Sequence, residues 1–354
     1  MTQRKRITYL DIARGIGMLL VVMGHVEYID LNVRFYVTAF HMPLFFVISG
    51  ILIQEKETEK TSFSKLIKTK LYSIMLPYVV FSLLSFLIEG SRIAIKGLDE
   101  WDIVFRQLFQ SVCLQGVSTL WFLPALFISE LAFVGIRKRT SHGATIGIVG
   151  ILIFLCVFLS YEENLCYQMY GANLIYGLLH EVLSMILRNL FCVAFICLGY
   201  YLNKCVLKKP LKGVLEITLA VCGLLLAGVL VKINPGVDLR YMRLHNFMIY
   251  TGEVVSGTVS VLFLSIFLRR LPLGIVSKVI QFYGRNSLVI MVTHMDFRVL
   301  YCSIKVAEII YTWIPGQVIF CIGIVLFVFL FEIPIIWFIN KFFPVIIGKR
   351  IKSS

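Results

Sequence analysis

The chain has 354 residues, of which 59% are apolar and only 15% are charged, and its mean hydropathy is +0.88. A soluble domain carries about a quarter charged residues and less than half apolar ones, so this composition excludes a soluble, disordered or disulfide-framework protein. The net charge of +14 would suggest nucleic acid in a soluble protein, but here it indicates basic loops that orient membrane helices, so we expect a lipid bilayer and no nucleic acid as partner.

Ten segments are apolar and long enough to cross a bilayer, whose core needs about 20 mostly apolar residues per helix. The first, sixth and ninth of them are the least apolar. Because these spans and their short links use nearly the whole chain, we predict an all-α, polytopic membrane bundle of about ten helices, in a single domain of residues 1–354. Their approximate ranges are 7–26, 35–54, 71–89, 119–136, 143–160, 185–203, 213–231, 247–268, 276–295 and 318–340.

The basic residues of the loops test this division into ten spans. If the N-terminus is cytoplasmic, the segments on the inside carry 22 Lys and Arg and those on the outside carry 10. Every inside segment is basic, as the positive-inside rule requires, and one span more or fewer would break the alternation. We therefore expect both termini in the cytoplasm and a multi-pass protein of the cell membrane, in the bacterial plasma membrane.

The longest outside link, residues 90–118, contains an amphipathic pattern. Trp101, Phe105, Leu108 and Phe109 recur in it at helical spacing. Such a segment typically forms a helix that lies in the interface between lipid and water. We predict an interfacial helix here.

The first span carries three ionisable residues, Asp11, Arg14 and His25. Such groups are costly inside a membrane and usually mark a pathway or a site. Asp11 and Arg14 are neighbours on one helix face, and eleven residues separate Arg14 from His25, which places them on the same face and about 16 Å apart. Alternatively, Arg14 snorkels to the cytoplasmic headgroups and His25 only packs between helices.

Polar groups also occur in the second and fourth spans. Residues 40–50 contain His41 and Ser49 on either side of Pro43, which can kink the helix. Trp121 opens the fourth span at the outer interface, where an aromatic-belt role is the simpler interpretation. For Ser49 the simpler interpretation is helix packing.

The ninth span carries three consecutive polar residues, Arg285, Asn286 and Ser287, and it has His294 near its end. Three such residues do not face lipid. They either cap and pack helices close to the cytoplasmic interface or contribute to a site.

The nine cysteines are scattered, mostly within apolar runs, and form no CxxC pair. We interpret them as small core residues and predict neither a metal site nor a disulfide.

With these motifs in the right order along the whole chain, the sequence resembles the acyltransferase 3 family of integral membrane acyltransferases, in particular its fucose 4-O-acetylase-like members. The spacing of Arg14 and His25 is similar to the first-helix signature of that family. The other stretches that carry the resemblance are residues 40–50, 120–127, 284–294 and 343–349. Some relatives append a soluble hydrolase domain, which we do not expect here.

The resemblance implies transfer of an acyl group, most often acetyl, from cytoplasmic acyl-CoA to a hydroxyl of a cell-surface or capsular glycan or its lipid-linked precursor. Acetyl-CoA would be a co-substrate, and we expect no permanently bound cofactor. Arg14 at the CoA phosphates would leave the thioester close to His25. A neutral His25 would then act as the catalytic base on the acceptor hydroxyl.

The resemblance also implies further site residues. We expect Ser49, Asn286 and Ser287 to supply hydrogen bonds to the developing oxyanion, and His41, Trp121 and His294 to contact substrate. Relatives often carry an arginine cluster just before the proline of the third span. Here Lys68 and Lys70 stand well before Pro77 and the residues nearer the proline are not basic, so the donor contacts of that cluster come either from these two lysines or from elsewhere in the chain.

Two other classes of function fit parts of the sequence. Polar groups inside helices also mark transport pathways, so the alternative is a multi-pass transporter of a small solute or glycan precursor. A structural or assembly protein is the third. A cavity with Arg14 at its cytoplasmic mouth would favour the enzyme, whereas a continuous pore or paired inverted repeats would favour transport.

Overall fold

The computed structural model describes residues 7–53, 62–170, 174–207 and 211–349. Several basic residues used above for the orientation, Arg4, Lys5, Arg6, Lys56, Lys60, Lys208, Lys209, Arg350 and Lys352, lie outside these ranges. The described part of the chain is helical and contains no β-strand beyond one isolated bridge between Asp238 and Arg243. The predicted all-α fold class is confirmed.

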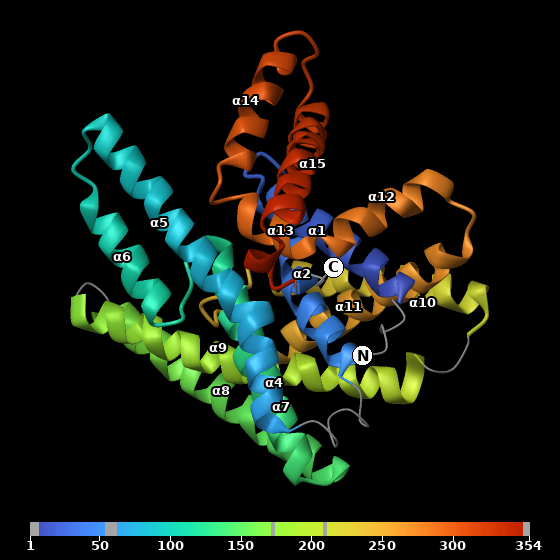
Figure 1. The fold of residues 1–354 in the computed structure, drawn as a ribbon. Helices are drawn as coiled ribbons and strands as arrows, with labels where there is room; N and C mark the ends of the chain where they lie inside the picture. The colour runs from blue at the N-terminus through green and yellow to red at the C-terminus, as the bar shows by residue number, and fades with distance from the viewer. Residues whose placement is uncertain (1–6, 54–61, 171–173, 208–210, 350–354) are drawn as a thin grey trace.

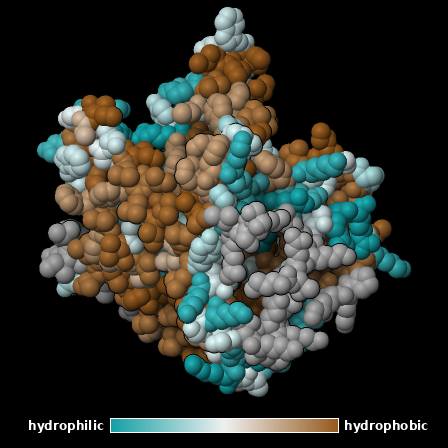
Figure 2. All heavy atoms as spheres, in the orientation of Figure 1, coloured by the Kyte–Doolittle hydropathy of each residue, from teal (hydrophilic) through white to brown (hydrophobic). Residues whose placement is uncertain are grey.

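Eight helical segments are long and apolar enough to cross a membrane, counted over the described residues, and they coincide with the second to eighth and the tenth predicted spans. Large side chains on their outer faces, such as Leu83, Leu87 and Phe154, are more than half exposed, as lipid-facing residues would be. Figure 2 shows a broad apolar surface on the α4–α5 side and hydrophilic side chains near α12. The segments are α2 (Leu31–Leu52), α4 and α5 (Phe63–Lys70 and Leu76–Lys96, joined by a π-helical turn), α7 (Phe122–Arg139), α8 (His142–Tyr170), α9 (Leu174–Leu202), α10 (Gly213–Ile233), α11 (Phe247–Arg270) and α15 (Gln317–Phe342).

The first and ninth predicted spans differ from these eight. The first is helix α1 (Thr8–His25), which is helical as expected but is not among the long apolar segments. The ninth is divided into α12 (Gly274–Arg285) and α13 (Ser287–Thr293). The division falls at Asn286, whose backbone (φ −108°, ψ 17°) leaves the helical region. Polar residues at this point contact other helices instead of continuing an apolar span.

Contacts between the helix ends agree with the predicted alternation. At the end that carries Arg14, hereafter the Arg14 end, Asn203 donates to the carbonyl of Ile51 (3.1 Å) and Tyr72 to that of Lys349 (3.2 Å). At the opposite end, hereafter the His25 end, Gln317 donates to the carbonyl of Tyr28 (2.8 Å) and Ser160 to that of Met242 (2.8 Å). Each of these contacts joins two segments that the loop charges assign to the same side.

The outside link 90–118 packs in a way that its amphipathic pattern did not indicate. Its helix α6 (Trp101–Val112) runs back antiparallel along α5, as Figure 1 shows. The ring of Trp101 lies beside Gly90, and the hydroxyl of Tyr78 donates to the carbonyl of Ser111 (2.7 Å). The hairpin therefore carries the chain deep into the bundle before α7 begins.

Helices α1 and α12 approach so closely that their glycines leave no room for a side chain. A Cβ atom at Gly284 would overlap the carbonyl oxygen of Asp11, and one at Gly15 would overlap the carbonyl oxygen of Ile280. This close contact fixes α1, which carries Arg14 and His25, against α12, which leads into the segment with Ser287 and His294.

We expect Gly284→Ala to destabilise the protein by about 1–3 kcal/mol or more, because an added methyl group in a well-packed contact forces the backbones apart. Thermal unfolding of the purified protein measures the effect. Gly147→Ala in α8 is the matched control, since no atom lies within 4 Å of the added Cβ, and alanine is the better helix former. Equal melting temperatures for the two variants would contradict a rigid α1–α12 contact.

Candidate functional site

Two histidines from distant parts of the sequence meet at the His25 end. His25 is the last residue of α1, and His294 directly follows α13. Their ring centroids lie 5.3 Å apart, and His294 is completely buried. The structure thus joins the candidate catalytic base and a residue that the sequence placed only in a separate motif.

Hydrogen bonds fix the tautomers of the neighbouring histidines. Nδ1 of His294 lies 2.6 Å from the carbonyl oxygen of Ile290, and Nδ1 of His41 lies 3.0 Å from that of Val37. A carbonyl oxygen only accepts, so each Nδ1 carries the proton and each Nε2 keeps a lone pair in the neutral ring. Nε2 of His294 is buried and has no hydrogen-bond partner among the described residues.

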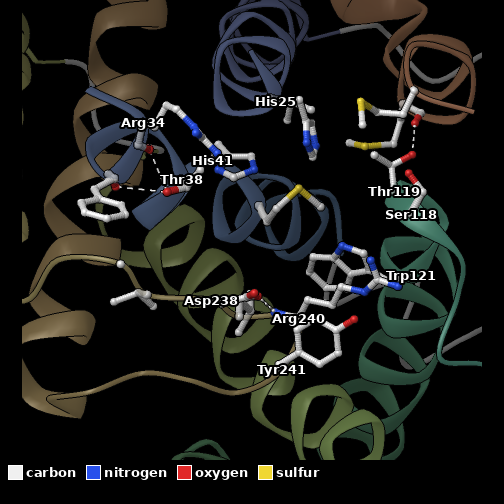
Figure 3. A pocket seen from close by; sticks show the side chains of 18 residues that line it. His25, Arg34, Thr38, His41, Ser118, Thr119, Trp121, Asp238, Arg240 and Tyr241 are labelled. Carbon is white, nitrogen blue, oxygen red and sulfur yellow. Dashed lines mark hydrogen bonds between the residues drawn. The ribbon is translucent and has the colours of Figure 1, made fainter. Parts of the chain in front are cut away.

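His25 and His41 line a cavity of about 460 Å³. Figure 3 shows both rings directed into it from α1 and α2, with Trp121 on the opposite wall. Arg240 and Tyr241 enter from the link between α10 and α11. The imidazole of His25 makes no hydrogen bond to any residue in the described part of the chain, so its ring nitrogens are available to a ligand in this first cavity.

His25 also lines a second cavity, of about 380 Å³. This one lies between the α5–α6 hairpin and the chain that follows α13, and its wall includes Ser85, Gln107, Asp296 and Arg298. Burial raises the pKa of Asp296 to about 6, while the hydroxyls of Ser118 and Ser85 and the charge of Arg240 act in the opposite direction. The imidazole of His25 therefore has a cavity on each side.

A fully buried arginine supports the wall of the first cavity. The guanidinium carbon of Arg188 lies 5.0 Å from the ring centroid of Trp121, and Nη1 is within 3.5 Å of the carbonyl oxygens of Gln115 and Arg240. A cation over an indole face is attracted by the ring quadrupole. Trp121, whose simpler interpretation was an interfacial belt residue, is held inside the bundle by this contact.

Two buried charged residues were not among the predicted site residues: Arg188, which lies near the outer end of the sixth predicted span and was counted with the outside charges, and Glu332. Glu332 is completely buried in α15, and the hydroxyl of Thr293 lies 2.8 Å from its Oε1. Thr293 directly precedes His294, so this contact anchors the backbone that carries the second histidine. The available signal was that Glu332 is the single charged residue of the predicted span 318–340, since an ionisable group in a span usually has a function.

At the other end of α1, one carboxylate lies between two arginines. Asp11 is 3.7 Å from Nη1 of Arg14 and accepts a hydrogen bond from Nε of Arg285 (3.0 Å). The side chain of Arg14 remains 28% exposed. Two guanidinium groups against one buried carboxylate leave a positive charge at this end, although Arg14 lines neither of the two cavities at His25.

The other predicted site residues also lie toward the Arg14 end. Ser49 donates to the buried carboxylate of Glu130, and the ammonium of Lys70 lies 2.6 Å from the same carboxylate. Lys68 is exposed, and Asn286 accepts a hydrogen bond from Asn340 (2.9 Å).

Ser287, at the start of α13, follows Asn286 directly. The structure brings none of Ser49, Asn286 and Ser287 into the cavities at His25. The polar groups that do line the first cavity include Ser118, Trp121 and Tyr241.

No three His, Cys, Asp or Glu side chains in the described ranges are grouped so that they would hold a metal ion. The cysteines with described side chains are free thiols.

Comparison with known proteins gives one match. The model of the acyltransferase 3 family, described as an acyltransferase domain, matches residues 7–333. No curated protein and no solved structure matches the chain.

Proposed function

The chain belongs to the acyltransferase 3 family, and on that premise we propose that this multi-pass membrane acyltransferase is an O-acyltransferase. It would take an acyl group, most often acetyl, from cytoplasmic acyl-CoA and pass it to a hydroxyl of a cell-surface or capsular glycan or its lipid-linked precursor. The observation that carries the proposal is the position of His25, which borders two cavities and contacts His294.

His25 would act as the general base. Its neutral imidazole takes the proton of the acceptor hydroxyl while the hydroxyl oxygen attacks the thioester carbonyl. The C–O bond forms, the C–S bond breaks, and the CoA thiolate takes the proton back from the imidazolium. Ser118, Trp121 and Tyr241 are the donors of the first cavity that can stabilise the oxyanion in between.

His294 would position the base. Its Nε2 carries a lone pair, is buried without a partner in the described part of the chain, and belongs to a ring in contact with His25. An acceptor at this place stabilises an N–H of His25 and, with it, the imidazolium that forms during transfer. The hydrogen bond from Thr293 to Glu332 fixes the backbone next to His294 and so holds its ring beside His25.

The donor would approach from the Arg14 end. The loop charges favour a cytoplasmic position for this end, and the pair of Arg14 and Arg285 around Asp11 leaves positive charge for the phosphates of CoA. The helical rise separates Arg14 from His25 by about 16 Å, which suits the extended pantetheine arm. The exposed Lys68 can add a donor contact, whereas Lys70 is paired with Glu130.

Mass spectrometry of surface glycans tests the proposal. Cells that produce the protein should carry O-acyl groups that are missing from cells that lack it and from cells that produce His25→Gln. Purified protein with isotope-labelled acetyl-CoA should release CoA in step with acylation of the isolated glycan. An O-acyl inventory that is the same in all three strains would overturn the function, and altered solute uptake without such a change would point to transport.

A further inference from the structure

Two arginines line the first cavity. Arg34 reaches it from α2 and Arg240 from the link between α10 and α11, as Figure 3 shows. Neither guanidinium forms a salt bridge with any residue that the structure describes, and in each the Nε atom is buried without a hydrogen-bond partner. The guanidinium of Arg240 donates from Nη2 to the carbonyl of Gly116 (2.8 Å).

One carboxylate, that of Asp238, shares the wall with them. Its Oδ1 accepts the backbone N–H of Arg240 (2.8 Å), so this carboxylate is already engaged with the main chain. The described lining of the cavity therefore carries two positive groups against one negative group. Arg34 and Arg240 are partly buried, and charges that are withdrawn from water are normally paired, because an unpaired ion loses its hydration at a cost. Unused guanidinium donors at a cavity wall thus indicate an anionic ligand.

The second cavity has the opposite balance. Its wall carries the carboxylates of Glu27, Glu89 and Asp296 against the single guanidinium of Arg298, which lies 3.4 Å from Glu89. An anion that reaches His25 is repelled from this side and attracted to the side of Arg34 and Arg240. The two faces of the same imidazole are therefore electrostatically distinct.

From these observations we propose that the acceptor is a sugar that carries an anionic group, phosphate or carboxylate, which binds between Arg34 and Arg240. This inference rests on the proposed function, because it places the acceptor hydroxyl at His25 in the same cavity. Arginine forms two parallel hydrogen bonds with either anion. Trp121 and Tyr241 offer aromatic faces to the sugar ring, and a cavity of about 460 Å³ lies in the range of small-molecule sites.

Binding to the detergent-purified full chain tests the anion site directly. The probes are inorganic phosphate, glucuronate and glucose, measured by titration calorimetry. We expect phosphate and glucuronate to bind at least tenfold more tightly than glucose. Arg34→Gln and Arg240→Gln should each weaken the anionic probes about tenfold or more and leave glucose unchanged. Arg243→Gln is the matched control, since Arg243 is exposed in the same link and does not line the cavity.

Two further ligands, acetyl-CoA and an anionic lipid, test whether Arg34 and Arg240 bind the acyl donor or a lipid headgroup instead of the acceptor. Acetyl-CoA affinity should survive both arginine substitutions, and a loss there would assign the two arginines to the donor and overturn the inference. Added phosphatidylglycerol should not displace glucuronate. Displacement by the lipid, or equal binding of glucose and the anionic probes, would also overturn it.

The same measurements distinguish the two proposals. Anion binding that depends on the two arginines, in a protein that transfers no acyl group, would support the anion site and contradict the proposed function. The opposite result is acyl transfer that is equally fast to neutral and anionic glycans and that the arginine substitutions do not change. It would support the proposed function and contradict the anion site.

Discussion

Replacing His25 with alanine is expected to lower turnover per folded molecule by about 10²–10⁴-fold, the usual contribution of a general base. His25→Gln should fail almost as completely, because glutamine keeps much of the size and hydrogen bonding but cannot accept a proton near neutral pH. Acetyl-CoA should still bind to both variants, since a base acts on the transition state more than on the ground state. Turnover with labelled acetyl-CoA, normalised to folded protein, measures the loss.

A packing role for His25 predicts a different pattern. His25→Gln would then be tolerated, and His25→Ala would reduce the yield of folded protein more than the rate of each molecule. His142→Gln, at the Arg14 end, is the matched control for a histidine lost elsewhere and should keep normal turnover. Near-normal turnover in His25→Gln would remove this residue from the catalytic role.

The pH dependence of the wild-type rate follows from the same assignment. A base must be neutral before it accepts a proton, so the rate should fall about tenfold per pH unit below the pKa of His25 and level off above it. Acetyl-CoA affinity should not follow this curve. A rate that stays constant over the pH range in which His25 itself titrates would contradict general-base catalysis by His25.

The sequence predicted most of the fold because hydropathy and loop charge report directly on spans and sides. The ninth span is an instructive exception. Arg285, Asn286 and Ser287 stand inside a range that hydropathy alone joins into one helix, and the break becomes necessary only through tertiary contacts, such as the hydrogen bond from Arg285 to Asp11. A local pattern does not contain the position of that distant carboxylate.

Several residues of the candidate site could be predicted from the sequence, but the contacts between them could not. Helical periodicity placed Arg14 and His25 on one face of one helix, because both belong to the same regular element. The contact of His25 with His294 joins residues far apart in the sequence, and it depends on how tightly α1 packs against α12 and α13. The hairpin of α5 and α6 likewise brings Trp121 inward, over Arg188, which spacing within either segment cannot indicate.

Replacing Arg14 with alanine is expected to weaken acetyl-CoA binding about ten- to a hundredfold, since a hydrogen bond to a charged group contributes about 1.5–3 kcal/mol. Arg14→Lys should recover part of the affinity, because the charge survives and the planar fork is lost. The fold should tolerate both changes, since Arg285 still pairs with Asp11 (3.0 Å). Titration calorimetry with acetyl-CoA measures the affinity.

Two further variants separate a phosphate contact from a structural one. Asp11→Asn releases Arg14 from its carboxylate neighbour, so acetyl-CoA affinity should increase, whereas a merely structural ion pair would lose stability without any gain in affinity. Arg139→Ala, exposed at the C-terminal end of α7 at the same end of the bundle, is the matched control for the loss of one positive charge. If Arg14→Ala bound acetyl-CoA as tightly as Arg139→Ala, Arg14 would be a snorkelling anchor, and the donor phosphates would need another partner.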